Sequence, residues 1–570
     1  MTRWSACLAV PLLLLVSSLV WATGSSEAPA ANAPVEIGLW RSIGRFAPEE
    51  RYKTVPYERD YGMLEKKFNV KFVFTDVPAQ SQDEQLNIMV ATNNLPDIVY
   101  SWSSMDKSFL DPALLYADNL IFALDEFSAQ IPDYLALLKT YPAIKKSVTN
   151  DAGKLICFRE PNVYLESAFS GGPMLRKDWL DKLGLKIPDT YLEWLNVFEA
   201  FKTKDPNGNG KADETPYVGS WGTLRVLANT LGTPDDFFMK AGPNSEVVYG
   251  PALPEYKDRL IFMRTMVQKG YINATYNNFS TADRDQMMAN DTAGSTFTGI
   301  GNMDRWNLSQ EAAGHPTFLM WAVAYPKGLD GNRHFDRGQI TKSTTDATIM
   351  IAKSSKNPAV AAKICNYFYS EEGMLLDTFG VEGITYQMKN GFPIYSDLIM
   401  KSPEKLTPND AREKYVGISG VPRPIDIRDV AQLNLTTPAS RAAVMRIWTD
   451  VFDINNNQPI PPALMDNKDA QEYADIMADL KTYVDTESTK FAEGRLSIET
   501  DFAKFQAAVK TMGYERALAL QNKAVKQWQD RGGPYVYNMA RAKIDWTNLP
   551  MLSGRGSNLV DPSMISKVVK

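Results

Sequence analysis

The stretch Gly172–Pro216, GPMLRKDWLDKLGLKIPDTYLEWLNVFEAFKTKDPNGNGKADETP, carries the most information about the fold. Thr190 and Glu193 form a T-x-x-E capping box directly after Pro188, which predicts that a helix begins here. Apolar residues then recur at the i, i+3, i+4, i+7 spacing of a helix with one buried face, namely Trp194, Val197, Phe198 and Phe201. The pattern predicts an amphipathic helix that ends near Lys204.

The residues that follow this helix match the opening D-x-[DN]-x-[DN]-G of an EF-hand calcium loop. Alternate side chains in such a loop direct oxygens inward, a glycine allows the sharp bend, and one carbonyl supplies a backbone ligand. We therefore expect a structural calcium site with the ligands Asp205, Asn207, Asn209, Lys211 (through its carbonyl), Asp213 and Glu214. The last loop position is Pro216 instead of the usual Glu, so Glu214 would have to close the shell. A plain Asn-Gly turn without metal is the alternative.

Short apolar segments on both sides of this stretch read as strands that alternate with helices. Strands are expected at Val35–Leu39, Val70–Phe74, Asp97–Tyr100, Thr317–Tyr325 and Ala347–Ala352, and helices at Gln85–Ala91 and after Asn357-Pro358. This alternation predicts an α/β fold.

Composition narrows the function classes. The chain has 570 residues, room for about four ordinary domains or two large lobes. A net charge of −6 without a basic block argues against nucleic acid or an anionic membrane as partner. Only two histidines occur, and H-E-x-x-H, G-x-S-x-G and G-x-x-x-x-G-K motifs are absent. Zinc proteases, Ser-His-Asp hydrolases and nucleotide hydrolases are therefore disfavoured, whereas a glycosidase needs only two carboxylates and stays open.

The N-terminus reads as an export signal. A short positive region at Arg3 precedes the apolar stretch Leu8–Val20, and small residues precede a cleavage point after Ala22. We expect a signal peptide at 1–22, with an uncleaved anchor as the alternative, and a flexible tether at 23–34. Cys7 precedes the apolar region, so no lipid anchor is expected and the protein should be periplasmic or otherwise extracytoplasmic.

The exported chain keeps two cysteines, Cys157 and Cys365. Two cysteines in a chain of this length do not make a disulfide framework, although an oxidising compartment would allow them to pair. Buried free thiols are the favoured interpretation.

Aromatic residues make up 11% of the chain, which suits stacking on the apolar faces of sugar rings. Turn or strand-end contexts single out Trp40, Trp102, Trp221, Trp306 and Tyr386. Strand ends are where ligands bind in α/β lobes. For each single aromatic residue, packing in the core is the alternative.

Five segments together resemble the extracellular solute-binding proteins of carbohydrate ABC importers. They are Asn87–Trp102, Leu175–Trp194, Ser354–Gly373, Phe379–Tyr386 and Lys490–Leu518. The predicted calcium loop and the chain length are similar to those of the large alginate- and oligosaccharide-binding members. Asp501-Phe502 departs from the Asp-Trp usual in the family, and residues 533–570 extend beyond its usual end.

The resemblance implies a two-lobed periplasmic-binding-protein fold with an interlobe cleft and a hinge. Its expected parts are an N-terminal lobe of residues 35–166 plus 326–386, a C-terminal lobe of 167–325 plus 387–532, and an extension at 533–570. It implies a monomer that is not an enzyme, captures an oligosaccharide between the lobes, and delivers it to permease subunits in the inner membrane.

Polar ligand-binding candidates are residues beside the selected aromatics, Arg41, Asp304 and Arg305. Arginines would hold the carboxylates of a uronic-acid sugar through paired hydrogen bonds. A secreted glycosidase, or a peptide- or lipid-binding protein on the same scaffold, remains as the alternative because a scaffold does not set its ligand.

Overall fold

The computed structural model describes residues 33–43, 61–78, 82–101, 111–150, 152–161, 171–240, 246–334, 344–416 and 465–530, with Arg428, Ile447, Trp448, Ile460, Pro461 and Ala463. The expected signal peptide, most of the tether, Trp102 and the C-terminal extension lie outside the described residues. Within these ranges, no helix is both long enough and apolar enough to cross a lipid bilayer.

A five-stranded mixed sheet forms the centre of the N-terminal lobe. Its strands lie in the order β2 (Val70–Pro78), β1 (Val35–Ile43), β3 (Ile98–Ser101), β10 (Thr344–Ile351) and β4 (Phe158–Pro161). β1 runs parallel to β2 and β3, whereas β10 runs antiparallel to β3 and β4. Ile37 and Leu39 of β1 are fully buried, as the alternating pattern predicts.

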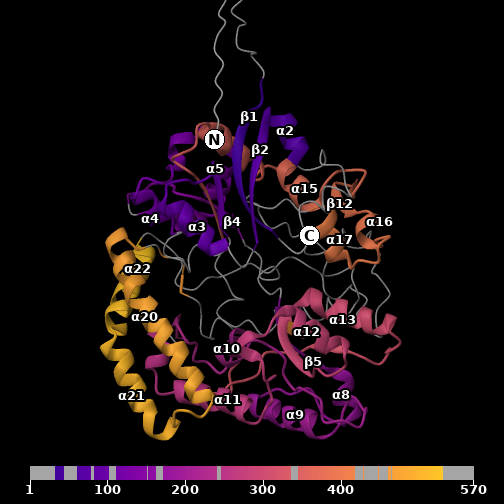
Figure 1. Ribbon diagram of the computed structural model, residues 1–570. Coiled ribbons are helices and arrows are strands. Elements are labelled where there is room, and N and C mark those ends of the chain that lie inside the picture. The colour runs from indigo at the N-terminus through magenta and orange to yellow at the C-terminus, as the bar shows by residue number, and fades with distance from the viewer. Residues whose placement is uncertain are drawn as a thin grey trace, which may run out of the picture.

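Helices from both ends of this lobe's sequence pack around the sheet (Figure 1). They are α2 (Tyr61–Phe68), α3 (Gln82–Ala91), α4 (Pro112–Ala117), α5 (Pro132–Thr140), α6 (Pro142–Ser147), α14 (Pro358–Tyr367) and α15 (Glu371–Phe379), with a 3₁₀ turn at Leu124–Phe127. Cys157 and Cys365 are both buried in this core as free thiols.

The C-terminal lobe is built on a three-stranded antiparallel sheet, β8 (Ser295–Gly299), β5 (Gly171–Arg176) and β9 (Met320–Ala322). Its helices are α8 (Lys177–Lys182), α9 (Tyr191–Thr203), α10 (Trp221–Asn229), α11 (Tyr256–Gln268), α12 (Thr281–Ala289) and α13 (Ile300–Ala312). β9 is much shorter than the strand expected at Thr317–Tyr325.

The capping box predicted for α9 is confirmed. The Thr190 hydroxyl accepts from the Glu193 amide at 3.3 Å, and the Glu193 carboxylate accepts from the Thr190 amide at 3.0 Å. Trp194, Phe198 and Phe201 are buried, so the predicted apolar stripe faces the core.

The chain crosses between the lobes after β4 and again between β9 and β10. Gly171, the first residue of β5, pairs with Gly299, the last residue of β8. The Gly171–Gly299 end of this sheet is therefore its interlobe edge. Figure 1 shows α10, α12 and α13 on the side of the C-terminal lobe nearest the other lobe. The two-lobed α/β fold expected from the sequence is confirmed.

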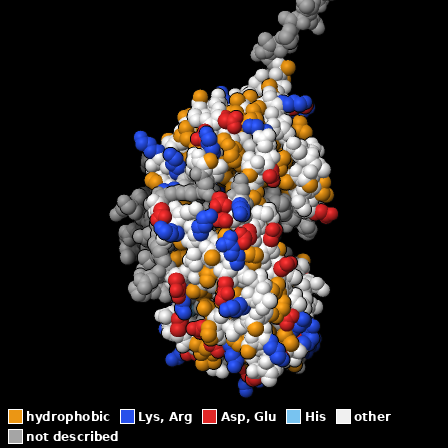
Figure 2. Space-filling model, turned by 90° about the vertical axis from the view of Figure 1, so that its left-hand side faces the viewer, with side chains coloured by type: hydrophobic (Ala, Val, Ile, Leu, Met, Phe, Trp, Pro, Cys, Tyr) orange, Lys and Arg blue, Asp and Glu red, His pale blue; other side chains and the backbone are white. Residues whose placement is uncertain are grey.

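Three helices near the C-terminus form an arm along one side of the molecule (Figure 1): α20 (Asn467–Ala492), α21 (Ile498–Thr511) and α22 (Tyr514–Asp530). α20 contacts α11 of the C-terminal lobe and also α4 of the N-terminal lobe. The arm also packs against a hairpin of β6 (Phe237–Met239) and β7 (Val247–Tyr249). Figure 2 shows Lys, Arg, Asp and Glu side chains of both signs interspersed over this face of the molecule.

A smaller unit follows α15, and it differs from the expected division of the lobes. The hairpin β11 (Tyr386–Lys389) and β12 (Phe392–Tyr395), with α16 (Asp397–Met400) and α17 (Pro408–Tyr415), shares a core with Phe379 at the end of α15. The sequence analysis placed residues 387–532 in the C-terminal lobe. Ring contacts of Phe379 with Tyr386 and Tyr395, at 5.8 and 4.8 Å, hold the first part of this range to α15 instead.

Candidate functional site

The loop after α9 folds around the carboxylate of Asp205. Its Oδ1 accepts from the amides of Gly208 and Asn209 at 2.9 and 3.1 Å, and its Oδ2 accepts from the Gly210 amide at 3.1 Å. Gly208 and Gly210 have φ values of +77° and +75°, which favour glycine. The sequence therefore makes a tight loop in which polar side chains converge.

Two further candidate ligands converge on Asp213. Asn207 donates its amide to Asp213 Oδ1 at 3.1 Å, and Asn209 donates to the two oxygens of the same carboxylate at 3.2 and 3.1 Å. The Lys211 amide donates to Asn209 Oδ1 at 2.8 Å. The candidate ligands are thus brought together, with the amide nitrogens of both asparagines on the carboxylate.

Glu214 is the unusual member of the group. It is only 7% exposed, and neither of its buried carboxylate oxygens has a hydrogen-bond partner among the described residues. Burial raises the pKa of Glu214, and the nearby carboxylates of Asp205 and Asp213 raise it further. A cation would compensate these three acids, so the donor set fits calcium.

The carboxylates alone do not form a metal cluster. In the part of the chain that the structure describes, no three His, Cys, Asp or Glu side chains come close enough together to hold an ion. Asparagine and backbone oxygens would have to complete a shell, which is how calcium loops of this type are built.

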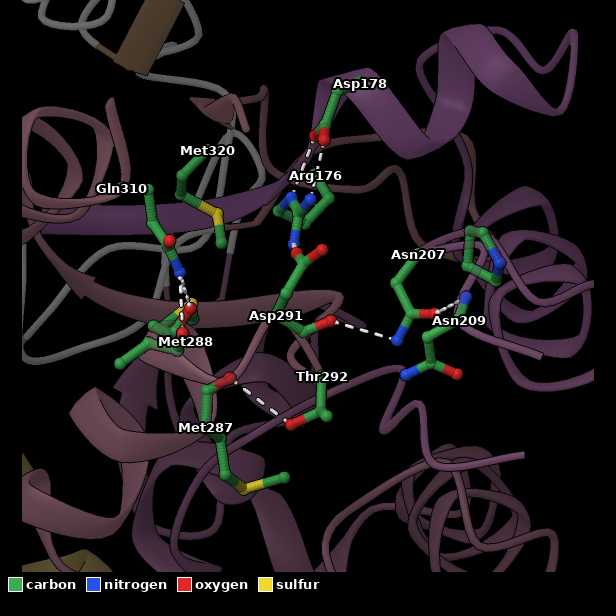
Figure 3. A network of polar contacts seen from close by, with 12 residues as sticks. Arg176, Asp178, Asn207, Asn209, Met287, Met288, Asp291, Thr292, Gln310 and Met320 are labelled. Carbon is green, nitrogen blue, oxygen red and sulfur yellow. Dashed lines mark hydrogen bonds and ion pairs between the residues drawn. The ribbon is translucent and has the colours of Figure 1, made fainter. Parts of the chain in front are cut away.

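The loop is fastened to the lobe on two sides. Lys182 of α8 donates to the Pro206 carbonyl at 2.8 Å. Asn207 donates to the Asp291 carbonyl at 3.2 Å, and the Asp291 side chain in turn pairs with the buried Arg176 of β5 at 2.5 Å (Figure 3). These contacts connect the loop to the central sheet of the lobe.

A second polar group lies at the interlobe edge. Trp306 Nε1 and Arg305 Nη2 of α13 both donate to Oδ1 of Asp285 in α12, at 3.0 and 2.9 Å. Arg284, the neighbour of Asp285, donates to Thr298 Oγ1 at 2.8 Å. The guanidinium groups of Arg284 and Arg305 lie 5.1 and 5.9 Å from the Trp306 ring centroid.

Arg305 and Trp306 are candidates from the sequence, whereas Arg284 and Asp285 were missed. Nothing local marks these two, because Arg-Asp is an ordinary dipeptide on a polar helix and its partners are 14 to 21 residues away. Asp304 is adjacent to Arg305 but is buried against the lobe.

Trp221 occupies the first position of α10. Its Nε1 donates to Asp485 of α20 at 2.8 Å, and its ring lies 5.9 Å from that of Tyr276. Tyr276 donates its hydroxyl to Glu493, the residue directly after α20, at 3.2 Å. The helical arm thus fixes the orientation of this candidate aromatic residue.

The remaining candidates do not join a common group. Trp40 is fully buried in the core of the N-terminal lobe, and Tyr386 is buried beside Phe379. Neither ring is accessible to a ligand in this structure. Arg41 lies in β1, next to Trp40, but its side chain is outside the described part, as is Trp102.

Comparison with known proteins identifies the family of this chain. The model of the bacterial extracellular solute-binding protein family matches residues 49–375. The polygalacturonan/rhamnogalacturonan-binding protein YtcQ of Bacillus subtilis is 27% identical over 401 residues, 67% of this chain and 74% of YtcQ. The fructooligosaccharide ABC transporter substrate-binding protein FusA of Streptococcus pneumoniae is 24% identical over 489 residues, 82% of this chain and 86% of FusA.

Solved structures agree on the fold. The alginate-binding protein AlgQ2, in a structure without calcium ion, superimposes with a TM-score of 0.69 at 21% identity, covering 87% of this chain and 98% of AlgQ2. An EF-hand mutant of FusA with fructo-nystose gives a TM-score of 0.69 at 19% identity, covering 87% and 99%. The family match spans more than half of the sequence, and the chain belongs to the bacterial extracellular solute-binding proteins.

Proposed function

We propose that this protein captures an oligosaccharide between its two lobes and presents it to the permease of an ABC importer. The observation that carries the proposal is the polar and aromatic group at the interlobe edge, where Arg305 and Trp306 converge on Asp285. The related chain YtcQ is named as a polygalacturonan/rhamnogalacturonan-binding protein, and FusA is named as a fructooligosaccharide ABC transporter substrate-binding protein.

Capture works through a hinge. The chain crosses between the lobes from β4 to β5, from β9 to β10 and again between α17 and Trp448, which packs in the core of the C-terminal lobe. Such crossings allow the lobes to move as bodies, and a ligand that contacts both lobes favours the closed state. The ligand leaves chemically unchanged, because the proposed role is binding and not catalysis. A permease in the inner membrane, export by the N-terminal signal, and a monomeric state belong to the same proposal.

We also propose that the Asp205–Glu214 loop binds a structural calcium ion. The unpartnered, buried carboxylate of Glu214 beside two further acids supports this assignment. Asp205, Asn207, Asn209, Asp213, Glu214 and the Lys211 carbonyl would supply the oxygens. The ion would neutralise the acids and fix the loop against α8 and Asp291.

The function is tested by calorimetric titration of the purified protein with a panel of oligosaccharides, and with peptides as the contrasting class. Saturable binding of an oligosaccharide that chromatography then recovers intact supports the proposal. Binding of peptides only, or cleavage of the sugar, contradicts it.

The calcium site is tested by thermal unfolding with calcium and with a chelator, in the wild type and in Glu214→Gln. Calcium at a hundredfold excess over its dissociation constant should add about 2.7 kcal/mol to the wild type. An unfolding temperature that chelation leaves unchanged contradicts the site.

A further inference from the structure

Two arginines at the interlobe edge share one carboxylate. Arg305 Nη2 donates to Asp285 Oδ1 at 2.9 Å, and Arg284 Nη2 lies 3.7 Å from the same oxygen. Trp306 Nε1 donates to Asp285 Oδ1 as well, so much of the hydrogen-bonding capacity of this carboxylate oxygen is taken. Two cations with one anion leave this arginine pair, Arg284 and Arg305, with an excess positive charge.

The arginine pair is also incompletely hydrogen-bonded. The side chains of Arg284 and Arg305 are only 11% and 24% exposed, and the Nε–H group of each is buried with no acceptor among the described residues. Burial lowers the pKa of Arg284, the Asp285 carboxylate offsets part of this, and the positive charge of Arg305 lowers it again. An anion is therefore the missing partner that the local chemistry favours.

The pair lies at the edge where the chain crosses between the lobes. Arg284 Nη1 and Asn302 Nδ2 each donate to Thr298 Oγ1 at 2.8 Å. Thr298 pairs with Gly172, next to the first residue of β5. The pair thus belongs to the C-terminal lobe's face toward the other lobe, on the side where Figure 1 shows α12 and α13.

We propose that Arg284 and Arg305 bind a carboxylate of the oligosaccharide, so that the preferred ligand is an acidic sugar chain that contains uronic acids. This inference rests on the proposed function and names its substrate class. A guanidinium presents a planar fork of donors that matches a carboxylate, and one such group balances the excess charge of the pair. The Trp306 ring lies 5.1 and 5.9 Å from the guanidinium groups of Arg284 and Arg305, and Asp285 and Asn302 accept hydrogen bonds from Arg305.

The experiment is a calorimetric titration with tetragalacturonate and tetramannuronate, each beside its carboxyl-reduced neutral counterpart, with kestose as a further neutral probe. We expect the wild type to bind at least one uronate about tenfold or more tighter than its neutral counterpart. Arg284→Gln and Arg305→Gln should each weaken uronate binding about tenfold to a hundredfold, and weaken binding of the neutral counterparts much less. Arg305→Lys keeps the charge without the fork and should fall between wild type and Arg305→Gln.

Arg264→Gln is the matched control. Arg264 on α11 is 25% exposed, close to the exposure of Arg305. It pairs with Glu499 at 3.2 Å, and this pair does not lie at the interlobe edge. The Arg264→Gln variant changes the net charge by the same amount as Arg305→Gln and should keep the wild-type affinity for uronates. Unfolding temperatures identify variants that fail to fold, and Arg305→Lys then carries the test.

Binding of neutral sugars as tight as or tighter than uronates overturns the inference and leaves the proposed function standing. Uronate affinity that survives in folded Arg284→Gln and Arg305→Gln also overturns it. If none of these sugars binds, the inference fails, and the wider oligosaccharide and peptide panel then decides on the proposed function.

Discussion

Replacing Arg176 by methionine is expected to destabilise the C-terminal lobe strongly. Arg176 is nearly fully buried, between the rings of Trp179 and Phe318 at 4.5 and 3.9 Å from their centroids. Its guanidinium binds both oxygens of Asp178, at 2.8 and 2.6 Å, and one oxygen of Asp291 at 2.5 Å. Methionine can fill the space between the rings, but it leaves two carboxylates without their cation.

The magnitude follows from the exposure of those carboxylates. Removing one partner of a fully buried ion pair costs about 3–5 kcal/mol, because the other charge stays buried. Asp178 and Asp291 are 17% and 31% exposed, so water can reach them in part. We therefore expect a loss near the lower end of that range, about 3 kcal/mol in the free energy of unfolding.

Urea unfolding measures this loss from the midpoint and slope of the transition. Lys177→Met is the matched control, since Lys177 is the next residue and its pair with Asp181 is at the surface. Its loss should stay below about 1 kcal/mol. Adding Asp178→Asn and Asp291→Asn to Arg176→Met should restore part of the stability, because the orphaned charges are then gone. A loss for Arg176→Met no larger than that of the control, or further loss in the triple variant, refutes the reasoning.

Three further predictions follow from other buried groups. Burial opposes ionisation of Asp235, but Arg259 and Arg225 hold its pKa below the usual value. The free energy of unfolding should therefore fall as the pH drops below about 4, and acid titration of Asp235→Asn should lack that part of the fall. Burial raises the pKa of Cys157 and of Cys365, so thiol reagents should label neither in the folded protein and both after unfolding; rapid labelling of the native state would contradict this. A Cβ atom on Gly172 would lie 2.4 Å from the Trp448 ring, so Gly172→Ala should lose about 1–3 kcal/mol in urea unfolding, and an unchanged midpoint would show that Trp448 does not pack there.

Local signals in the sequence predicted the elements better than their pairing. The capping box at Thr190 and the stripe from Trp194 to Phe201 define α9 because hydrogen bonds and burial there involve residues three or four apart. β10 was recognised as a strand, but its place between β3 and β4 was not, because these partners are about 250 and 190 residues distant in sequence. Pairing over such distances depends on how the lobes assemble, which no short pattern encodes.

The candidate site divides in the same way. The calcium-loop residues are contiguous, so their spacing predicts a cluster, and the structure does bring them together. Trp40 and Tyr386 were selected for their strand-end context, yet both rings turn into the core. Arg284 and Asp285 were missed because the contacts that give them a role come from α13 and β8.

The two proposed sites meet in α12, and this arrangement predicts how independent they are. Asn207 of the loop reaches the Asp291 carbonyl just after the helix, whereas Gln310 of α13 donates to the carbonyls of Met288 and Ala289 at its end.

α13 holds α12 without help from the loop. Chelating calcium should therefore lower the free energy of unfolding. It should change uronate affinity by less than about fivefold, the lower limit of typical allosteric coupling. Calorimetric titration of the folded protein with calcium and with chelator measures this. A larger loss of affinity without unfolding would show that α12 follows the loop and not α13.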